Sequence, residues 1–169
     1  KVLENKEIVL KELKFEEYFK PISATNSSTK EDNLATKLGT ITHKIFEIYW
    51  DKFDTIDINN ILNKFEIIEE NEQNKIKNSI ENFRNRDVYK LLKSGVEHRF
   101  ELEFNYQDKK GFIDLVYFDE SKAGWVIVDF KTGIKSQEKE EKYQKQLEFY
   151  KEVLSDIGMS VVGKEILWV

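Results

Sequence analysis

The sequence predicts a mixed α/β domain in which helices pack against one central sheet. The first observation is a period of three to four residues in the apolar positions between residues 34 and 93, which is typical of amphipathic helices. The second is a change to a period of two from Val96 onward, which indicates strands. The predicted order is helices, three strands in a meander, a helix and a last strand.

The composition limits the class of protein. A chain of 169 residues suits a single domain over residues 1–169, and its 40% hydrophobic content is enough for a core. The net charge of −5 argues against a broad basic surface for nucleic acid but allows a local basic groove. The lack of cysteine excludes disulfides, thiolate zinc sites and cysteine-ligated iron–sulfur clusters. Without a membrane-length apolar run or a signal peptide, we expect a cytoplasmic protein, and the start at Lys1 suggests a fragment of a longer chain.

The first half of the chain is predicted to be mostly helical. Residues 4–19 form an element of undetermined type, and a polar loop follows Pro21. Asn33 is the predicted N-cap of a helix over residues 34–53, and residues 57–93 predict two or three further helices. The apolar stripe of the first helix consists of Leu34, Leu38, Ile41, Ile45 and Ile48.

The second half is predicted to hold the sheet. Residues 96–106 alternate and predict a strand, and residues 107–111 predict the turn that follows it. A hairpin comes next along the chain. A charged helix is predicted over residues 138–158, closed by Gly158, and residues 161–169 predict the last strand.

Each strand of the predicted hairpin carries one aspartate among large apolar residues. If the loop over residues 119–124 is symmetric, Phe118 faces Trp125, and Asp114 faces Asp129 with Cβ atoms about 4.5–5.5 Å apart. At an effective dielectric constant of about 20, two such charges about 4–5 Å apart repel by about 3–4 kcal/mol. A divalent cation between them would offset this repulsion, and oxygen ligands of this kind suit Mg²⁺.

Lys131 follows Asp129 by two residues, so strand alternation places both on one face. A lysine beside a metal can orient or help to deprotonate a water, or stabilise the transition state of phosphodiester hydrolysis. In the alternative, structural interpretation, Asp114 and Lys131 form a cross-strand ion pair and Asp129 ends a strand. The choice depends on the register, because a slip of one residue would put the aspartates on opposite faces.

The chain has two histidines, His43 and His98. His43 lies on the side of its predicted helix opposite the apolar stripe, with Gly39 and Glu47 near it. It is therefore either a site residue or an ordinary surface histidine. His98 alternates with apolar residues in its strand and is interpreted as structural.

In their order along the chain, these residues resemble the motifs of the PD-(D/E)XK nuclease superfamily, and specifically the RecB/AddA-like nuclease domain at the C-terminus of bacterial helicase–nucleases. The resemblance covers most of the chain, and Ile113 stands where the family name has proline. The matching segments are LGTITHKIFE (38–47), EHRF (97–100), GFIDLV (111–116), VDFKTG (128–133) and YQKQLEFY (143–150).

The resemblance implies a restriction-endonuclease-like core. This core is a mixed central sheet, with a three-stranded antiparallel meander and a further strand, flanked by helices and preceded by a helical N-terminal part. The implied cofactor is Mg²⁺, for which Mn²⁺ can substitute, in the branch without an iron–sulfur cluster. The implied metal ligands are His43, Asp114, Asp129 and the backbone carbonyl of Phe130.

The resemblance also implies roles beside the metal. Lys131 would be the catalytic lysine, and Gln146 and Tyr143 would support the site or touch DNA. Glu47 and Glu97 would support the ligands or the fold. From the residues alone, the helix face that carries Tyr143, Gln146 and Tyr150 is better interpreted as a core-packing face with a buried amide, which needs hydrogen-bond partners.

The resulting hypothesis is a metal-dependent DNA exonuclease domain that hydrolyses phosphodiester bonds. The resemblance implies that it belongs to an ATP-dependent helicase–nuclease of double-strand-break repair and recombination, which delivers single strands of DNA to it. A second helicase–nuclease subunit is a further expected partner, a membrane is not, and Lys44, Lys135 and Lys145 are candidates for a local basic groove. The alternatives are an inactive DNA-binding or scaffold module of the same fold and a stand-alone DNA repair nuclease.

Overall fold

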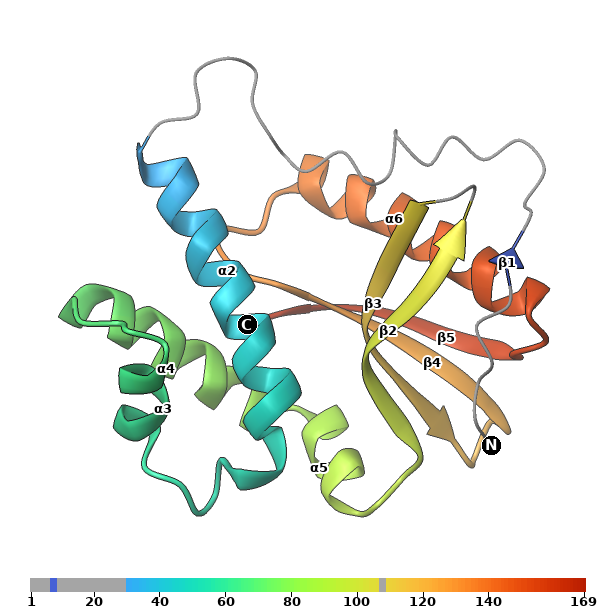
Figure 1. The fold of residues 1–169 in the computed structure, drawn as a ribbon. Helices are drawn as coiled ribbons and strands as arrows, with labels where there is room; N and C mark the ends of the chain where they lie inside the picture. Colours follow the sequence, from blue (N-terminus) through green and yellow to red (C-terminus); the bar gives the residue numbers. More distant parts are fainter. Residues whose placement is uncertain (1–6, 9–29, 107–108) are drawn as a thin grey trace. The chain divides into compact units, whose positions relative to one another are not determined.

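The computed structural model describes residues 7–8, 30–106 and 109–169 (Figure 1). The predictions for residues 4–6 and 9–29, including the loop after Pro21, lie outside the described residues. No helix within the described ranges is both long enough and apolar enough to cross a membrane. The elements are β1 (Glu7–Ile8), α2 (Lys30–Tyr49), the 3-10 helix η1 (Trp50–Lys52), α3 (Ile58–Lys64), α4 (Glu70–Arg84), α5 (Asp87–Lys93), β2 (His98–Tyr106), β3 (Lys109–Asp119), β4 (Gly124–Lys131), α6 (Gln137–Asp156) and β5 (Val161–Trp168).

The strands form one mixed sheet in the order β1-β2-β3-β4-β5. The pairs β2–β3 and β3–β4 are antiparallel, and the two-residue β1 runs parallel to β2. Hydrogen bonds from Trp125 N to Ser160 O (2.7 Å) and from Val169 N to Lys131 O (3.0 Å) show that β5 runs parallel to β4. A parallel pair needs a crossover, which α6 provides. The predicted mixed α/β architecture, an antiparallel meander with a further strand, is confirmed.

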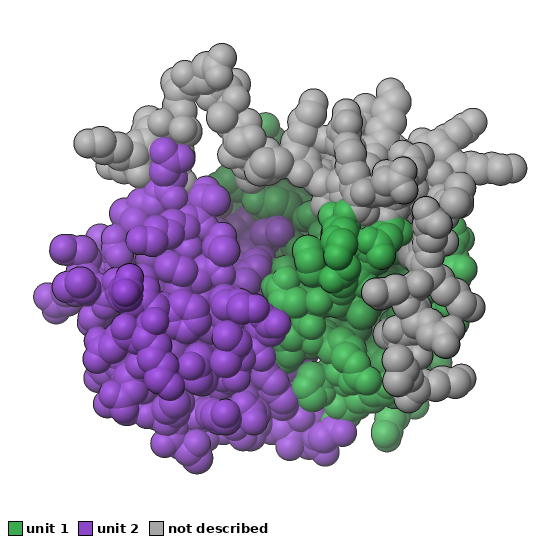
Figure 2. Space-filling view, viewed as in Figure 1, with its two compact units in different colours: residues 1–23, 96–129, 135–167 green, residues 24–95, 130–134, 168–169 purple. Residues whose placement is uncertain are grey.

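The chain divides into two compact units (Figure 2). Unit 1 comprises residues 1–23, 96–129 and 135–167, and therefore most of the sheet with α6. Unit 2 comprises residues 24–95, 130–134 and 168–169, and therefore α2 to α5 with the end of β4. Each unit is described below by itself.

The register of the β3–β4 hairpin is the symmetric one that its loop predicts. Phe118 pairs with Trp125, and the pairing reaches Leu115 and Val128 at the inner end. The strands extend one residue further than predicted, because Asp119 also pairs with Gly124. The Asp119 carboxylate accepts hydrogen bonds from the backbone of the turn, which fixes the loop at four residues.

The turn between β2 and β3 is shorter than the predicted turn over residues 107–111. Tyr106 pairs with Lys109, and Lys110 and Gly111 are strand residues. Gly111 is required by packing and not by a turn, since a Cβ there would lie 2.2 Å from Cζ of Phe104, its partner on β2. The prediction of a turn at Gly111 was therefore wrong, because glycine also serves close cross-strand packing.

The core of unit 1 lies between the sheet and α6 (Figure 1). Ser136 caps the helix by accepting a hydrogen bond from Lys139 N, and Gly158 follows its end with φ of +87°. The buried side chains include Leu147, Tyr150 and Val153 from α6 and Ile113, Val116 and Ile127 from the strands. The period of 3.6 in α6 thus buries one face of the helix. Strand β4 is buried on both faces, because Val126 to Phe130 are all buried.

The buried face of α2 in unit 2 overlaps the predicted stripe in part, because Leu38 and Ile45 are buried as predicted. Thr42 and Phe46 are buried, whereas Ile48 is 43% exposed. The Phe46 ring stacks on Phe83 (4.6 Å between centroids) and contacts Phe130 edge-on (5.1 Å), so the aromatic cluster turns the helix toward this face. The helix also begins at Lys30 and not after the predicted N-cap Asn33, since asparagine within a helix costs only a few tenths of a kcal/mol to about 0.7 kcal/mol.

Candidate active site

The two aspartates of the hairpin occupy neighbouring positions on β3 and β4. The pairing of β3 with β4 ends at Leu115 and Val128, and Asp114 and Asp129 each come one residue beyond this last pair. Asp114 is half-buried, and Asp129 is only 2% exposed. Burying a carboxylate is unfavourable unless charge or hydrogen bonds compensate it. The position of Asp129 is therefore one where a cation would be stabilising.

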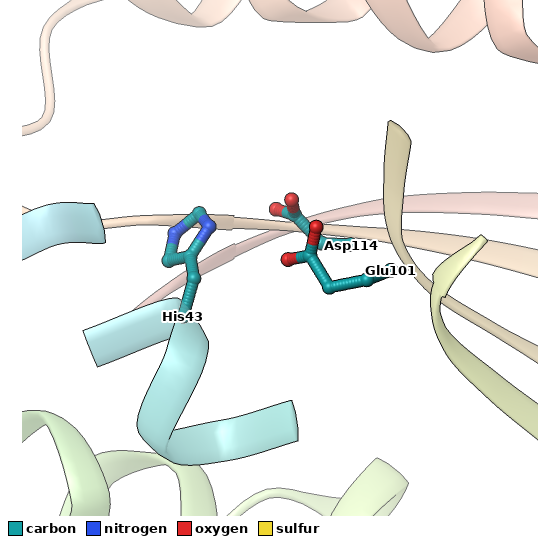
Figure 3. Close-up of side chains that lie close together, drawn as sticks. All are labelled: His43, Glu101 and Asp114. Atoms are coloured by element: carbon teal, nitrogen blue, oxygen red, sulfur yellow. The ribbon is translucent and has the colours of Figure 1, made fainter. Parts of the chain in front are cut away.

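A group of three side chains could hold a metal ion. His43, Glu101 and Asp114 each offer one ligand atom, and these atoms all lie within 4.8 Å of one another (Figure 3). One imidazole nitrogen and two carboxylate oxygens form a donor set that suits a divalent cation such as Mg²⁺ or Mn²⁺. The residues therefore fit such an ion, and the group contains two of the ligands that the resemblance implies, His43 and Asp114.

Glu101 is a candidate that the sequence analysis missed. It lies on β2 between Phe100, which pairs with Leu115, and Leu102, which pairs with Ile113, so it is level with Asp114. Its φ is +48°, a left-handed conformation that is rare for a glutamate inside a strand. The alternation of residues 96–106 could have placed Glu101 away from the apolar face. Nothing in the sequence indicated the left-handed backbone at Glu101. The predicted turn was also too long, so it gave a pairing of β2 with β3 in which Glu101 is not opposite Asp114.

His43 lies at the edge of the buried face of α2 and not opposite it. This placement follows from the rotation of α2, which buries Thr42 and Phe46 on either side of His43 along the chain. The imidazole ring contacts the ring of Phe130 edge-on, with 6.0 Å between centroids. Because Phe130 is bonded to Asp129 and Lys131, unit 2 sets His43 beside the end of β4. His43 is half-buried, and its role in a site stays a prediction.

Gln146 and Tyr150 form a hydrogen-bonded pair on α6. Gln146 Nε2 donates to Tyr150 Oη at 2.9 Å, and the Tyr150 side chain is 3% exposed. Burial and the negative charges of Asp129, Asp114 and Glu101 raise the pKa of the Tyr150 phenol well above its ordinary value. The phenol is therefore protonated at neutral pH, and the charges of all three carboxylates act on it.

The remaining predicted site residues lie at the following places. Lys131 is the last residue of β4 and is half-buried, two residues after Asp129. Tyr143 is half-buried on α6, one turn before Gln146. Phe130 has a buried ring, which leaves its backbone carbonyl as the candidate ligand.

The acids and lysines beside the motifs are mostly paired or exposed. Lys44 forms an ion pair with Glu47 (2.5 Å), and Lys135 forms one with Glu140 (3.2 Å). Exposed pairs of this kind are worth little and are easily exchanged for another anion. Glu97 is exposed and directly precedes β2, and Lys145 is exposed on α6.

A comparison with protein families now adds to this geometry. A family model of the PD-(D/E)XK nuclease superfamily matches residues 18–168. The chain belongs to the PD-(D/E)XK nuclease superfamily.

Membership sets the coarse function. PD-(D/E)XK nucleases act on DNA, usually hydrolyse phosphodiester bonds and use divalent metals, for which the group of His43, Glu101 and Asp114 is suited. A search of curated proteins gave no match.

Proposed function

We propose that the chain is a metal-dependent DNA exonuclease. The observation that carries this proposal is the convergence of an imidazole and two carboxylates, with ligand atoms within 4.8 Å of one another, in a PD-(D/E)XK chain. Mg²⁺ is the proposed cofactor, with Mn²⁺ as a substitute, because the donors are mostly carboxylate oxygens.

The proposed roles divide between holding the metal and handling the phosphate. His43, Asp114, Asp129 and the Phe130 carbonyl would hold the cation. When bound, the cation would act as a Lewis acid and lower the pKa of a coordinated water. The Lys131 ammonium group would stabilise the negative charge that develops on the phosphate oxygens and orient the attacking water.

Residues of α6 complete the proposed site. Gln146 and Tyr143 would support the ligands or contact DNA. The 2.9 Å hydrogen bond of Gln146 to Tyr150 favours a role for Gln146 in supporting the ligands. It holds the amide beside a phenol whose pKa is raised by the charges of the three carboxylates. Lys135 and Lys145 remain candidates for phosphate contacts, since exposed lysines can exchange a weak ion pair for DNA phosphate.

We infer further that the chain is the RecB/AddA-like nuclease part of a helicase–nuclease in break repair and recombination. The ordered motifs from residue 38 to residue 150 support this assignment. The net charge of −5 is also compatible with it, because a motor that holds the DNA would leave only a local groove to the nuclease. In this context the substrate is single-stranded DNA that the motor delivers, and a second helicase–nuclease subunit is the expected partner.

The test compares cleavage of end-labelled single-stranded DNA by the wild type, Lys131→Ala and Lys122→Ala, each with Mg²⁺, Mn²⁺ or EDTA. We expect a loss of about 100-fold or more for Lys131→Ala, since a group that stabilises transition-state charge contributes this much. Lys122→Ala is the matched control, because Lys122 is an exposed lysine in the turn of the same hairpin. Wild-type protein that binds DNA but does not cleave it with either metal would favour the inactive scaffold module.

A further inference from the structure

Glu101 brings a third carboxylate to the aspartates of the hairpin. Its ligand oxygen lies within 4.8 Å of that of Asp114, and both residues belong to unit 1 on adjacent strands. Figure 3 shows the two carboxylates side by side. Like charges directly opposite each other repel, so a cation bound by both carboxylates would be stabilising.

The backbone at Glu101 is distorted in a way that keeps the register. Phe100 pairs with Leu115 and Leu102 pairs with Ile113, so no residue is inserted on either strand. Only the conformation of Glu101 changes, with φ of +48°. Such a conformation is unfavourable for a side chain with a Cβ and persists where the surroundings impose it. The kink therefore changes the direction of one side chain without moving the strands on either side.

Independent observations indicate that the third carboxylate faces a ligand and not merely other acids. His43 contributes a ring nitrogen to the same group, and imidazole is a common metal ligand. The superfamily match, which uses none of this geometry, indicates divalent metals.

We propose that Glu101 is a further metal-binding residue, which adds a third carboxylate to the cation site. The proposal rests on the proposed metal-dependent function. It differs from the sequence motif, which indicates Glu97 and not Glu101 as the glutamate of this strand. Glu97 lies four residues earlier, roughly 13 Å along an extended strand, and is exposed.

The test measures metal binding directly. Mn²⁺ is titrated into the metal-stripped, full chain by calorimetry and by electron paramagnetic resonance, for the wild type, Glu101→Gln, Asp114→Asn and Glu103→Gln. We expect Glu101→Gln to weaken Mn²⁺ binding at least about tenfold, since even residues that only support ligands change metal affinity by about 10–100-fold. Glu103→Gln is the matched control on the same strand, where Glu103 pairs with Lys110 at 2.9 Å, and should bind within about twofold of wild type.

A second variant separates ligation from folding. Glu101→Asn shortens the side chain and removes the charge, and asparagine tolerates positive φ better than glutamate. We expect its melting temperature in EDTA to equal or exceed that of the wild type, while its Mn²⁺ affinity falls as in Glu101→Gln. This variant also carries the test if Glu101→Gln does not fold.

The outcomes distinguish this inference from the proposed function. If Glu101→Gln binds Mn²⁺ like the wild type while Asp114→Asn does not, Glu101 is not a ligand and the proposed metal dependence stands. If the wild type itself does not bind Mn²⁺, both proposals are wrong. Weakened binding in Glu101→Gln and Asp114→Asn with unchanged binding in Glu103→Gln supports both.

Discussion

Gln146 Nε2 donates a 2.9 Å hydrogen bond to the phenol oxygen of Tyr150, four residues further along α6. This spacing places both side chains on one face of the helix. The Tyr150 ring lies in the core of unit 1, where it contacts Phe104 edge-on at 5.7 Å between ring centroids. The hydrogen bond therefore holds the Gln146 amide at the edge of this core. The phenol accepts the hydrogen bond from Gln146, and burial and the charges of Asp129, Asp114 and Glu101 raise its pKa well above the ordinary value.

The first prediction concerns this pair. Tyr150→Phe should lower nuclease activity about 10–100-fold while the far-UV circular dichroism is unchanged, because it removes the hydroxyl that holds Gln146 and leaves the ring packing intact. Gln146→Leu should give a similar loss. The double variant should lose little more than either single variant, since residues of one network are not additive. Fully additive losses in single-turnover kinetics would show that the two residues act separately.

The second prediction concerns removal of the metal. Mn²⁺ at about 100 times its dissociation constant should stabilise the folded chain by about 2.7 kcal/mol relative to EDTA. For a chain of this size, that corresponds to a melting temperature higher by about 5–10 °C. Asp114→Asn should abolish the increase, and sodium chloride at equal ionic strength is the control. An equal increase in Asp114→Asn by differential scanning fluorimetry would place the metal elsewhere.

The third prediction concerns alkaline pH and Tyr89 in unit 2. Burial, followed by the hydrogen bond to Asp54 (3.1 Å), raises the pKa of Tyr89 to about 12. A folded-state pKa above the unfolded value of about 10 adds stability that is complete below pH 10 and is lost between about pH 10 and 12. The melting temperature of the wild type should therefore exceed that of Tyr89→Phe below pH 10, and the difference should shrink by pH 12. A difference independent of pH would contradict this assignment.

The fourth prediction concerns Gly111 and Phe104. Gly111→Ala should destabilise the chain by about 1–3 kcal/mol in urea unfolding, because the new Cβ would meet the Phe104 ring at 2.2 Å. Phe104→Leu should remove the clash, so the double variant should be more stable than the sum of the single effects allows. Strict additivity would mean that the glycine is needed for its backbone conformation alone.

Local patterns in the sequence were sufficient to predict much of the fold. The change of period at Val96, the order of elements and the symmetric β3–β4 register were predicted correctly, because each depends on residues that are close in the chain. Asp114 and Asp129 each come one residue beyond the last pair of this register, and their facing stays a prediction. The resemblance of the ordered motifs also anticipated the superfamily that the family comparison identified.

Other features depend on contacts between distant residues. The face of α2 that is buried is set by Phe46 against Phe83 and Phe130, and this decides that His43 is half-buried beside the end of β4. The place of Gly111 in a strand follows from the Phe104 ring.

The sequence by itself determined the elements, the hairpin register and the acids and lysine of the motif, since turns and periodicity act over a few residues. Only the tertiary structure decided that Glu101 stands level with Asp114 in a left-handed conformation, and that Phe46 lies on the buried face of α2. Strand pairing and core packing impose such features from outside the segment, so no local pattern can encode them.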